Sequence, residues 1–155
     1  MTKKAVKAPA TPVRRIGSFR VGLEAKPLGG VKRAIAKGLD AHNVGAAGSY
    51  GYADYVVSVR DAKGEVRGGF LVEVYYESAF LKWAWVDPKL QRRGLGNALM
   101  AAAEDEARRR GALNLWLDTF SFQARPFYEK LGYKVFGTLQ MGRAGVERFF
   151  LSKDL

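Results

Sequence analysis

Cysteine is absent from this chain of 155 residues, and histidine occurs only once, as His42. The lack of cysteine excludes disulfides, thiolate metal sites and a cysteine nucleophile. A single histidine excludes a metal site built from several histidines, and any Ser-His-Asp triad would have to use His42. No apolar run approaches the roughly 18 residues of a membrane-spanning helix, and the N-terminus lacks the apolar stretch of a secretory signal. We therefore expect a cytoplasmic protein with no metal and no membrane partner.

Acidic residues are scarce relative to basic ones, since 26 lysines and arginines against 15 aspartates and glutamates give a formal charge of +11. Residues 1–15 contain basic side chains and no acid, and they show no apolar periodicity. We predict a basic disordered tail over residues 1–15 and a single domain over residues 16–155. Positive charge attracts polyanions such as nucleic acid, anionic membranes or a phosphorylated cofactor. Because no helix-turn-helix or zinc pattern is present, we expect no specific nucleic-acid partner.

Apolar periodicity predicts strands and helices in an order typical of an α+β domain. Helices are expected over residues 28–42, 95–110 and 122–131, and strands over 16–24, 55–60, 65–77, 79–86, 113–119, 133–139 and 146–151. Long antiparallel stretches with a strand–helix–strand unit predict a mixed, mostly antiparallel sheet of about six to seven strands flanked by helices. We expect His42, at the end of the first helix, to be a surface cation rather than a catalyst.

Two sets of side chains are predicted to pack in the core. Helix 95–110 presents one apolar stripe, formed by Leu95, Ala98, Leu99, Ala102, Ala103 and Ala107. Strand 79–86 carries Trp83 and Trp85 on one face, and Trp116 lies on a neighbouring strand. Core packing is the first interpretation of these tryptophans.

The most specific feature is a glycine-rich turn between strand 79–86 and helix 95–110, with the sequence Gln91-Arg92-Arg93-Gly94-Leu95-Gly96-Asn97-Ala98. Two glycines allow the backbone to approach a ligand closely, and the free N–H groups at a helix start attract anions. The two arginines add positive charge, so the turn predicts a diphosphate site. The alternative is a turn that serves only strand-to-helix packing. The spacing fits neither a Walker loop nor the Rossmann fingerprint, whose third glycine is replaced here by Leu99.

This turn resembles the acyl-CoA-binding motif Q/R-x-x-G-x-G/A of the GNAT superfamily of N-acetyltransferases. Residues 121–133 resemble a second family pattern, N-x-x-A-x-x-x-Y-x-K-x-G-F/Y, with Tyr128 at the tyrosine and Ser121 in place of the asparagine. The run 117–124 is similar to a branch of small bacterial acetyltransferases. The resemblance covers residues 16–155 and implies the three-layer GNAT fold.

The resemblance implies an acetyl-CoA-dependent enzyme that transfers an acetyl group directly to a primary amine of a small molecule or a protein. The implied partners are acetyl-CoA, as the acyl donor, and an amine acceptor; no metal is implied. The pyrophosphate is expected on the backbone of residues 92–97, and the pantetheine arm beside strand 79–86. The full set expected to bind the donor is Trp85, Val86, Gln91, Arg92, Arg93, Gly94, Leu95, Gly96, Asn97, Ala98, Ser121 and Tyr128. Trp85 is also a candidate for lining the acyl pocket.

The same resemblance makes Tyr128 the candidate general acid for the thiolate sulfur, with a core aromatic as the alternative. The family's glutamate base would fall at about Phe80, so the match fails there. We predict Glu73 and Glu77 as substitutes, although solvated strand residues of this kind are common. Asp118, whose alternative role is to cap the next helix, and a water chain are further candidates for the base.

Two other functions stay open at this level. One is a non-catalytic acyl-CoA-binding module that has the fold without the base, and the other is a basic nucleic-acid-binding protein. The oligomeric state is also open, with a homodimer as one alternative.

Overall fold

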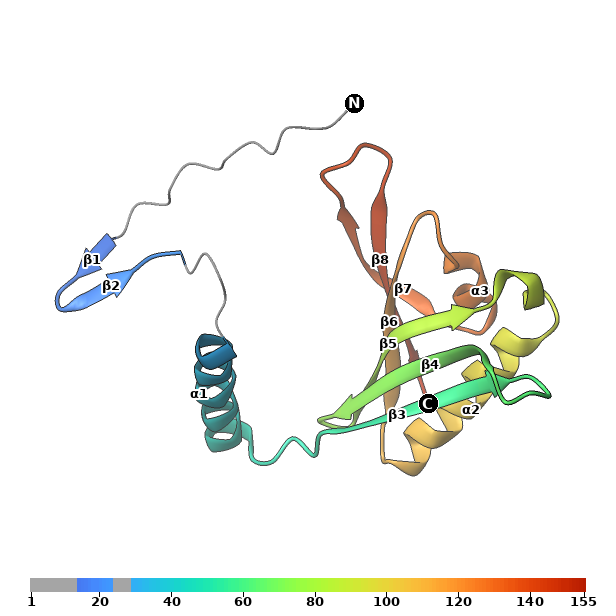
Figure 1. The fold of residues 1–155 in the computed structure, drawn as a ribbon, viewed down its shortest axis with the longest axis horizontal. Helices are drawn as coiled ribbons and strands as arrows, with labels where there is room; N and C mark the ends of the chain where they lie inside the picture. The colour runs from blue at the N-terminus through green and yellow to red at the C-terminus, as the bar shows by residue number, and fades with distance from the viewer. Residues whose placement is uncertain (1–13, 24–28) are drawn as a thin grey trace. The chain divides into compact units, whose positions relative to one another are not determined.

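The structure, a computed structural model, describes residues 14–23 and 29–155, and the chain divides into two compact units, Met1–Ser49 and Tyr50–Leu155. In the first unit β1 (Arg14–Ile16) and β2 (Phe19–Val21) pair as an antiparallel hairpin, where one strand over 16–24 was predicted (Figure 1). The chain reverses there because Gly17 adopts a φ of 58°. Most of the predicted tail over residues 1–15 lies outside the described residues, and a single domain over 16–155 stays a prediction.

The helix of the first unit, α1 (Gly29–Ala47), is longer than the predicted helix over 28–42. His42 therefore lies within the helix rather than at its end, where it is exposed to solvent. The expectation of a helix-terminal cation at this position is wrong, because the helix continues for more than a further turn.

The second unit contains a six-stranded mixed sheet in the order β3-β4-β5-β6-β8-β7. Its strands are β3 (Ala53–Arg60), β4 (Val66–Tyr75), β5 (Ser78–Val86), β6 (Asn114–Phe120), β7 (Lys134–Gln140) and β8 (Glu147–Asp154). Only β5 and β6 pair in parallel, and the crossover between them contains η1 (Pro88–Leu90) and α2 (Leu95–Arg109). A short helix, α3 (Arg125–Lys130), connects β6 to β7. The predicted α+β class and mixed sheet are confirmed.

The core of this unit lies between the sheet and α2, which packs against β3, β4 and β5 (Figure 1). Leu99, Ala103 and Ala107 are buried as predicted, but Ala98 and Ala102 are exposed. The buried stripe is instead completed by Met100 and Glu104. The predicted face was therefore rotated, because an alanine-rich helix defines its apolar side only weakly.

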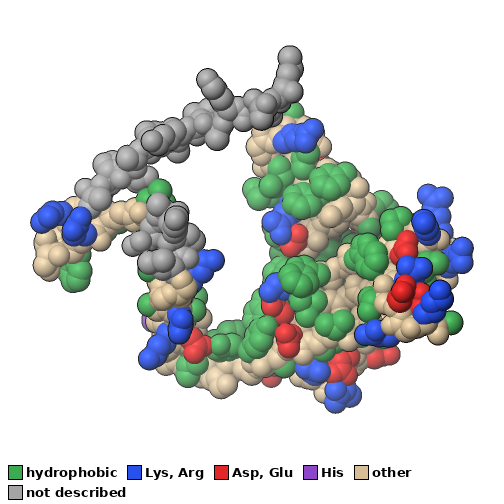
Figure 2. Space-filling view, in the orientation of Figure 1, with side chains coloured by type: hydrophobic (Ala, Val, Ile, Leu, Met, Phe, Trp, Pro, Cys, Tyr) green, Lys and Arg blue, Asp and Glu red, His purple; other side chains and the backbone are tan. Residues whose placement is uncertain are grey.

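Glu104 is buried because three polar groups satisfy its charge, one of them Arg108, whose Nη2 lies 3.5 Å from Oε2. The Lys153 Nζ atom lies 2.9 Å from both carboxylate oxygens, and the Tyr133 hydroxyl donates to Oε1 at 3.1 Å. A carboxylate with such partners can be placed in a core at a tolerable cost. Figure 2 shows both acidic and basic side chains on the visible face of this unit. Ion pairs on α2 include Arg108 with Asp105 and Arg109 with Glu106.

The parallel pairing of β5 and β6 ends early, and this opens the functional site. Residues Ser78–Leu81 pair with Asn114–Leu117, and beyond them β5 pairs only with β4. The register of β4 and β5 shifts there, since Val72 faces Leu81 whereas Leu71 faces Trp83. Lys82 is thus an extra residue in β5, and such a bulge bends a strand and increases its twist.

The same bulge reverses the faces of the two tryptophans on β5. Leu81 is buried against α2, and simple alternation would place Trp83 on the same side as Leu81. With Lys82 inserted, the side chains of Trp83 and Trp85 are on the other face and are 67% and 53% exposed. The prediction that these two residues pack in the core is therefore wrong.

Candidate active site

The glycine-rich turn has the backbone geometry of an anion site. Gly94 is the N-cap of α2 with a φ of 82°, and Arg92 also has a positive φ, of 62°. The first hydrogen bond of the helix runs from the Ala98 N–H to the Gly94 carbonyl at 3.0 Å, and the Gly94 cap supplies no side-chain hydrogen bond. The N–H groups of the first turn of α2 therefore lack intrahelical partners and are available to a ligand.

A cavity of about 590 Å³ lies at this turn. Its lining consists of Phe70, Ala84, Trp85, Val86, Gln91, Arg92, Gly94, Gly96, Asn97, Ala124, Phe127 and Tyr128. Eight of the twelve residues predicted to bind the donor are in this lining. The other four, Arg93, Leu95, Ala98 and Ser121, are not.

Ser121 is engaged elsewhere. Its N–H donates to the Glu147 carbonyl at 2.9 Å, and its Oγ accepts from the Glu147 N–H at 3.2 Å. These bonds connect the end of β6 to the start of β8. The geometry thus supports a structural role for Ser121 rather than a contact with the donor.

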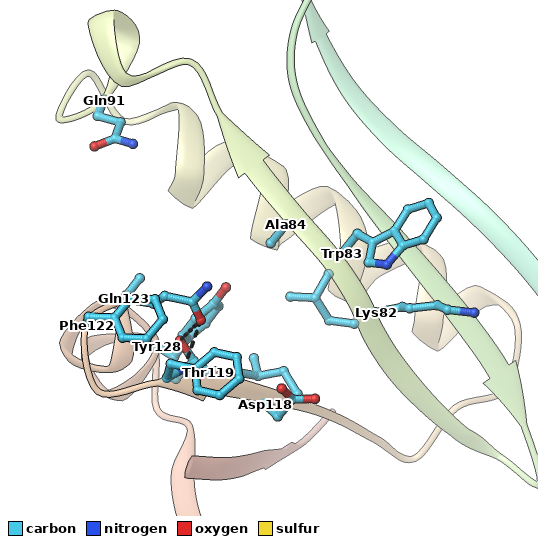
Figure 3. A pocket seen from close by; sticks show the side chains of 13 residues that line it. Lys82, Trp83, Ala84, Gln91, Asp118, Thr119, Phe122, Gln123 and Tyr128 are labelled. Carbon is cyan, nitrogen blue, oxygen red and sulfur yellow. Dashed lines mark hydrogen bonds between the residues drawn. The ribbon is translucent and has the colours of Figure 1, made fainter. Parts of the chain in front are cut away.

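A second cavity, of about 660 Å³, lies in the gap where β5 and β6 separate. It is lined from β5, the end of η1, β6, α3 and the segment leading into α3. The lining residues are Leu81, Lys82, Trp83, Ala84, Gln91, Leu117, Asp118, Thr119, Phe120, Phe122, Gln123, Ala124 and Tyr128. Figure 3 shows Asp118, Thr119, Phe122, Gln123 and Tyr128 on one side of this gap and β5 on the other. Ala84, Gln91, Ala124 and Tyr128 line both cavities, so the two spaces meet at Tyr128.

Tyr128 is held in place by aromatic neighbours. Its ring packs edge-on against Phe127 and Tyr133, with centroids 5.1 Å and 6.1 Å away. Burial raises the pKa of the Tyr128 hydroxyl to about 12, and the negative charge of Asp118 contributes to the shift. The hydroxyl is therefore protonated at neutral pH and can donate a proton.

Gln123 is a residue that sequence reasoning missed. Its Oε1 accepts from the Phe120 N–H at 2.8 Å and from the Thr119 hydroxyl at 3.2 Å (Figure 3). The side chain closes the turn after β6, and α3 accordingly begins at Arg125 rather than at the predicted residue 122. The capping role considered for Asp118 is not seen, since the N-cap of α3 is Ala124 and no side chain caps that helix. Only the place of Gln123 in the second motif could have drawn attention to it.

The two glutamates predicted as bases are not in either cavity lining. Glu73 Oε1 accepts from Lys82 Nζ at 2.6 Å and from the Tyr52 hydroxyl at 3.1 Å. Glu77 forms a tight hairpin turn with Tyr76, both with positive φ. From there to Ala84 is about 23 Å of extended strand. The geometry therefore does not support either residue as the base.

Within residues 14–23 and 29–155, no three histidine, aspartate or glutamate side chains come together in a way that would hold a metal ion. Over the same residues, no helix is both long and apolar enough to cross a membrane.

The start of α2, the part of β5 without a β6 partner and Tyr128 all contribute to the lining of the 590 Å³ cavity. That arrangement defines a class of protein, the coenzyme A-dependent acyltransferases. The chain belongs to the GNAT acetyltransferase family, since the profile of the acetyltransferase (GNAT) domain matches residues 52–135. It is thus an N-acetyltransferase that takes the acetyl group from acetyl-CoA and transfers it to an amine.

Three similar proteins illustrate the relationship. A blasticidin-S acetyltransferase from Streptomyces morookaense is 32% identical over 105 residues, which cover 67% of this chain and 75% of that protein. The [ribosomal protein bS18]-alanine N-acetyltransferase of Escherichia coli strain K12 is 36% identical over 72 residues, 45% of this chain and 49% of that protein. The crystal structure of an acetyltransferase from Bacillus cereus superposes with a TM-score of 0.79 at 25% identity, covering 87% of this chain and 98% of the other.

Proposed function

We propose that acetyl-CoA occupies the 590 Å³ cavity and that a primary amine of a small molecule enters through the 660 Å³ cavity. The observation that carries this proposal is the meeting of the two cavities at Tyr128. One of them fits the donor by its free helix N–H groups, and the other shares Tyr128 in its lining. Two substrates can therefore meet without exchanging places, as direct transfer requires.

Each part of the donor site has a distinct task. The N–H groups at the start of α2 and the Arg92 guanidinium neutralise the pyrophosphate. Residues 82–86 of β5 have no partner strand on the β6 side, so their backbone groups can hydrogen-bond the amides of the pantetheine arm. A backbone N–H of the same edge can stabilise the oxyanion that develops on the thioester carbonyl.

The acceptor nitrogen attacks the thioester carbonyl carbon, a C–N bond forms and the C–S bond breaks. Tyr128 donates its hydroxyl proton to the departing sulfur and later recovers a proton from solvent. The amine loses one proton in forming the amide. The products are the acetylated amine and the free thiol of coenzyme A.

The size of the acceptor cavity supports a small-molecule acceptor. A volume of about 660 Å³ lies in the range of about 300–1,000 Å³ typical of small-molecule pockets. A relative that aligns over 67% of this chain is named for blasticidin S. The relative named for a protein N-terminus aligns over less than half.

Release of the coenzyme A thiol, followed with blasticidin S, benzylamine and a peptide with an N-terminal alanine, tests the proposal. We expect release with one or both small amines, above the rate of hydrolysis without an acceptor. Release with the peptide alone would overturn the small-molecule proposal. If none of the three amines increases thiol release, transfer through this site is contradicted.

The donor site is tested by Gly94→Asp. Acetyl-CoA should raise the Tm of the wild type, because a ligand that binds only the native state stabilises it. Aspartate at position 94 places a carboxylate beside the pyrophosphate, so the rise in Tm should disappear. Gly111→Asp is the matched control, because Gly111 has the same left-handed φ of about 83° at the other end of α2 and equally open surroundings. An equal rise in Tm for both variants would place the diphosphate elsewhere.

Two further properties belong to the proposal. The need for acetyl-CoA, an intracellular metabolite, supports a cytoplasmic location. A homodimer stays a prediction, which the molar mass in solution tests against the 17.1 kDa of one chain.

A further inference from the structure

One wall of the 660 Å³ cavity carries an ion pair that donor binding does not use. Asp118 extends from β6 into the lining, and its Oδ1 accepts from the Arg148 Nε atom of β8 at 2.6 Å. The Arg148 guanidinium carbon lies 5.4 Å and 5.7 Å from the ring centroids of Phe120 and Phe150. The contacts with both rings favour one placement of the guanidinium, which in turn orients the carboxylate that it binds.

The second oxygen of this carboxylate is open. In the part of the chain that the structure describes, the hydrogen bond to Asp118 is made at Oδ1 alone. No side-chain oxygen or nitrogen there is both buried and without a hydrogen bond, so Oδ2 has contact with solvent. Figure 3 shows Asp118 in the wall that also carries Thr119 and Tyr128. Oδ2 can therefore receive a donor from a molecule in the cavity.

The charged residues that line this cavity differ in whether they can bind a cation that enters it, and Asp118 is the one that can. Lys82 of β5 also lines the cavity, but its Nζ is held by Glu73 at 2.6 Å. The Asp118 charge also contributes to the raised pKa of Tyr128 of α3, which lines the same cavity. Among the described residues that line the two cavities, Asp118 is the one carboxylate. A positively charged group that enters has no other anion in the lining to bind.

Resting on the proposed function, we infer that Asp118 binds the ammonium group of the acceptor through Oδ2 and accepts its proton, while Arg148 positions the carboxylate. The acceptor class is a primary ammonium compound with an apolar or aromatic body. That body lies against Phe120 and Phe122, whose rings stack with centroids 5.3 Å apart in the same wall.

The proton balance follows from these positions. The ammonium group gives one proton to Oδ2, and the neutral nitrogen then attacks the thioester carbonyl carbon. The nitrogen loses a second proton to water as the amide forms, and Tyr128 supplies the proton for the sulfur. Asp118 returns its proton to solvent, so one ammonium ion and one thioester yield one amide, one thiol and one released proton.

Benzylamine is the probe, because it joins a primary ammonium group to a flat apolar ring. The variant is Asp118→Asn, which keeps the shape and removes the charge. We expect kcat/KM for benzylamine at pH 7 to fall about 100-fold, the lower end for loss of a general base. Titration into protein saturated with coenzyme A should show at least tenfold weaker binding of benzylammonium and unchanged binding of benzyl alcohol.

The pH profile separates this role from a structural one. The wild type uses the ammonium form, so log kcat/KM should be nearly flat from about pH 6 to 8. The Asp118→Asn variant can react only with the neutral amine, so its log kcat/KM should rise by about one unit per pH unit over this range. Arg148→Met should lower kcat/KM about tenfold and give an intermediate slope, and Arg148→Lys should recover part of the loss. Asp105→Asn, at a carboxylate with 77% of its side chain exposed, is the matched control and should behave as the wild type does.

The outcomes distinguish this inference from the proposed function. Acetylation of benzylamine with the same rate and pH slope in Asp118→Asn as in the wild type would overturn the inference and leave the function standing. Binding of benzylammonium that depends on Asp118, without any acetylation, would sustain the inference and overturn the function. Loss of the acetyl-CoA-induced rise in Tm in Asp118→Asn would assign the residue to the donor site instead. A wild type that neither binds nor acetylates benzylamine would also overturn the inference.

Discussion

At the scale of single residues, the proposed mechanism depends on the protonation of one tyrosine, Tyr128. Tyr128 is on a helix of only six residues, and aromatic packing holds its ring more firmly than the helix does. Burial and the Asp118 charge raise the pKa of the hydroxyl to about 12. A proton donor must be protonated before the reaction, and this shift keeps the Tyr128 hydroxyl protonated up to about pH 11 while making it a weaker acid.

The variant Tyr128→Phe keeps the ring and removes the proton. Thiolates are good leaving groups, so we expect kcat to fall about 10–100-fold, near the low end for general acid catalysis. The affinity for acetyl-CoA should be nearly unchanged, because the missing bond forms mainly in the transition state. Steady-state and single-turnover rates with an active amine measure the effect. Tyr133→Phe, which lines neither cavity, is the control. Equal kcat for both variants, with chemistry limiting the rate, would reduce Tyr128 to a packing residue.

At the scale of elements, the β-bulge at Lys82 sets the geometry of β5. The extra residue falls where the pairing with β6 ends, so the strand bends away and exposes a backbone edge. The bulge also turns Trp83 and Trp85 to the face opposite α2. One inserted residue thus accounts for the gap and for the exposure of two large side chains.

Lys82 has no partner in β4, so deleting it should make β5 a regular strand. The residues that follow it should keep their present partners and point to the same faces of the sheet as before. We expect a folded protein in which β5 runs closer to β6, with the rise in Tm by acetyl-CoA reduced by half or more. Lys82→Ala keeps the bulge and removes only the ion pair with Glu73, so it should retain the full rise. Differential scanning fluorimetry with and without acetyl-CoA makes the comparison. A full rise in the deletion variant would show that the gap does not depend on the bulge.

At the scale of the whole molecule, buried tyrosine hydroxyls couple folding to alkaline pH. Burial raises the pKa of Tyr55 and of Tyr128 to about 12, and it also raises that of Tyr133. Tyr55 donates to the Ala103 carbonyl at 2.6 Å and Tyr133 to Glu104 at 3.1 Å, so both hydroxyls connect α2 to the sheet unit around it. If either hydroxyl ionised in the folded protein, it would place an unpaired negative charge in the core.

The free energy of unfolding should accordingly fall as the pH rises above 10. Below pH 10 these hydroxyls are protonated in both states, and between about 10 and 12 the unfolded state alone loses protons, which favours unfolding. A shift of two units is worth at most about 3 kcal/mol for each tyrosine. Urea titrations at pH 9 and pH 11 measure the fall, and the double variant Tyr55→Phe/Tyr128→Phe should show a smaller one. An equal fall in both proteins would attribute the alkaline loss to other groups.

Much of the fold was predictable because it depends on local chemistry, and so were the glycine turn and Tyr128 of the candidate site. The glycine turn was found because Gly94 and Gly96 follow an apolar strand and open a helix, and such spacing acts over a few residues. The order of strands and helices in the second unit followed from periodicity for the same reason. Tyr128 was found through the spacing of the second motif, although its catalytic role stays a prediction.

What only the tertiary structure decided concerns pairings between distant residues. The shift in register at Lys82 depends on how β4 and β5 meet, so alternation within β5 predicted the wrong face for Trp83 and Trp85. Asp118 meets Arg148 across 30 residues, and Glu104 meets Lys153 across 49. Charge pairing of this kind has no local signal, because either partner alone is typical of a solvated surface. The sequence by itself thus predicted the glycine turn as the donor site, whereas the Asp118–Arg148 pair of the proposed acceptor wall exists only once β6 and β8 lie side by side.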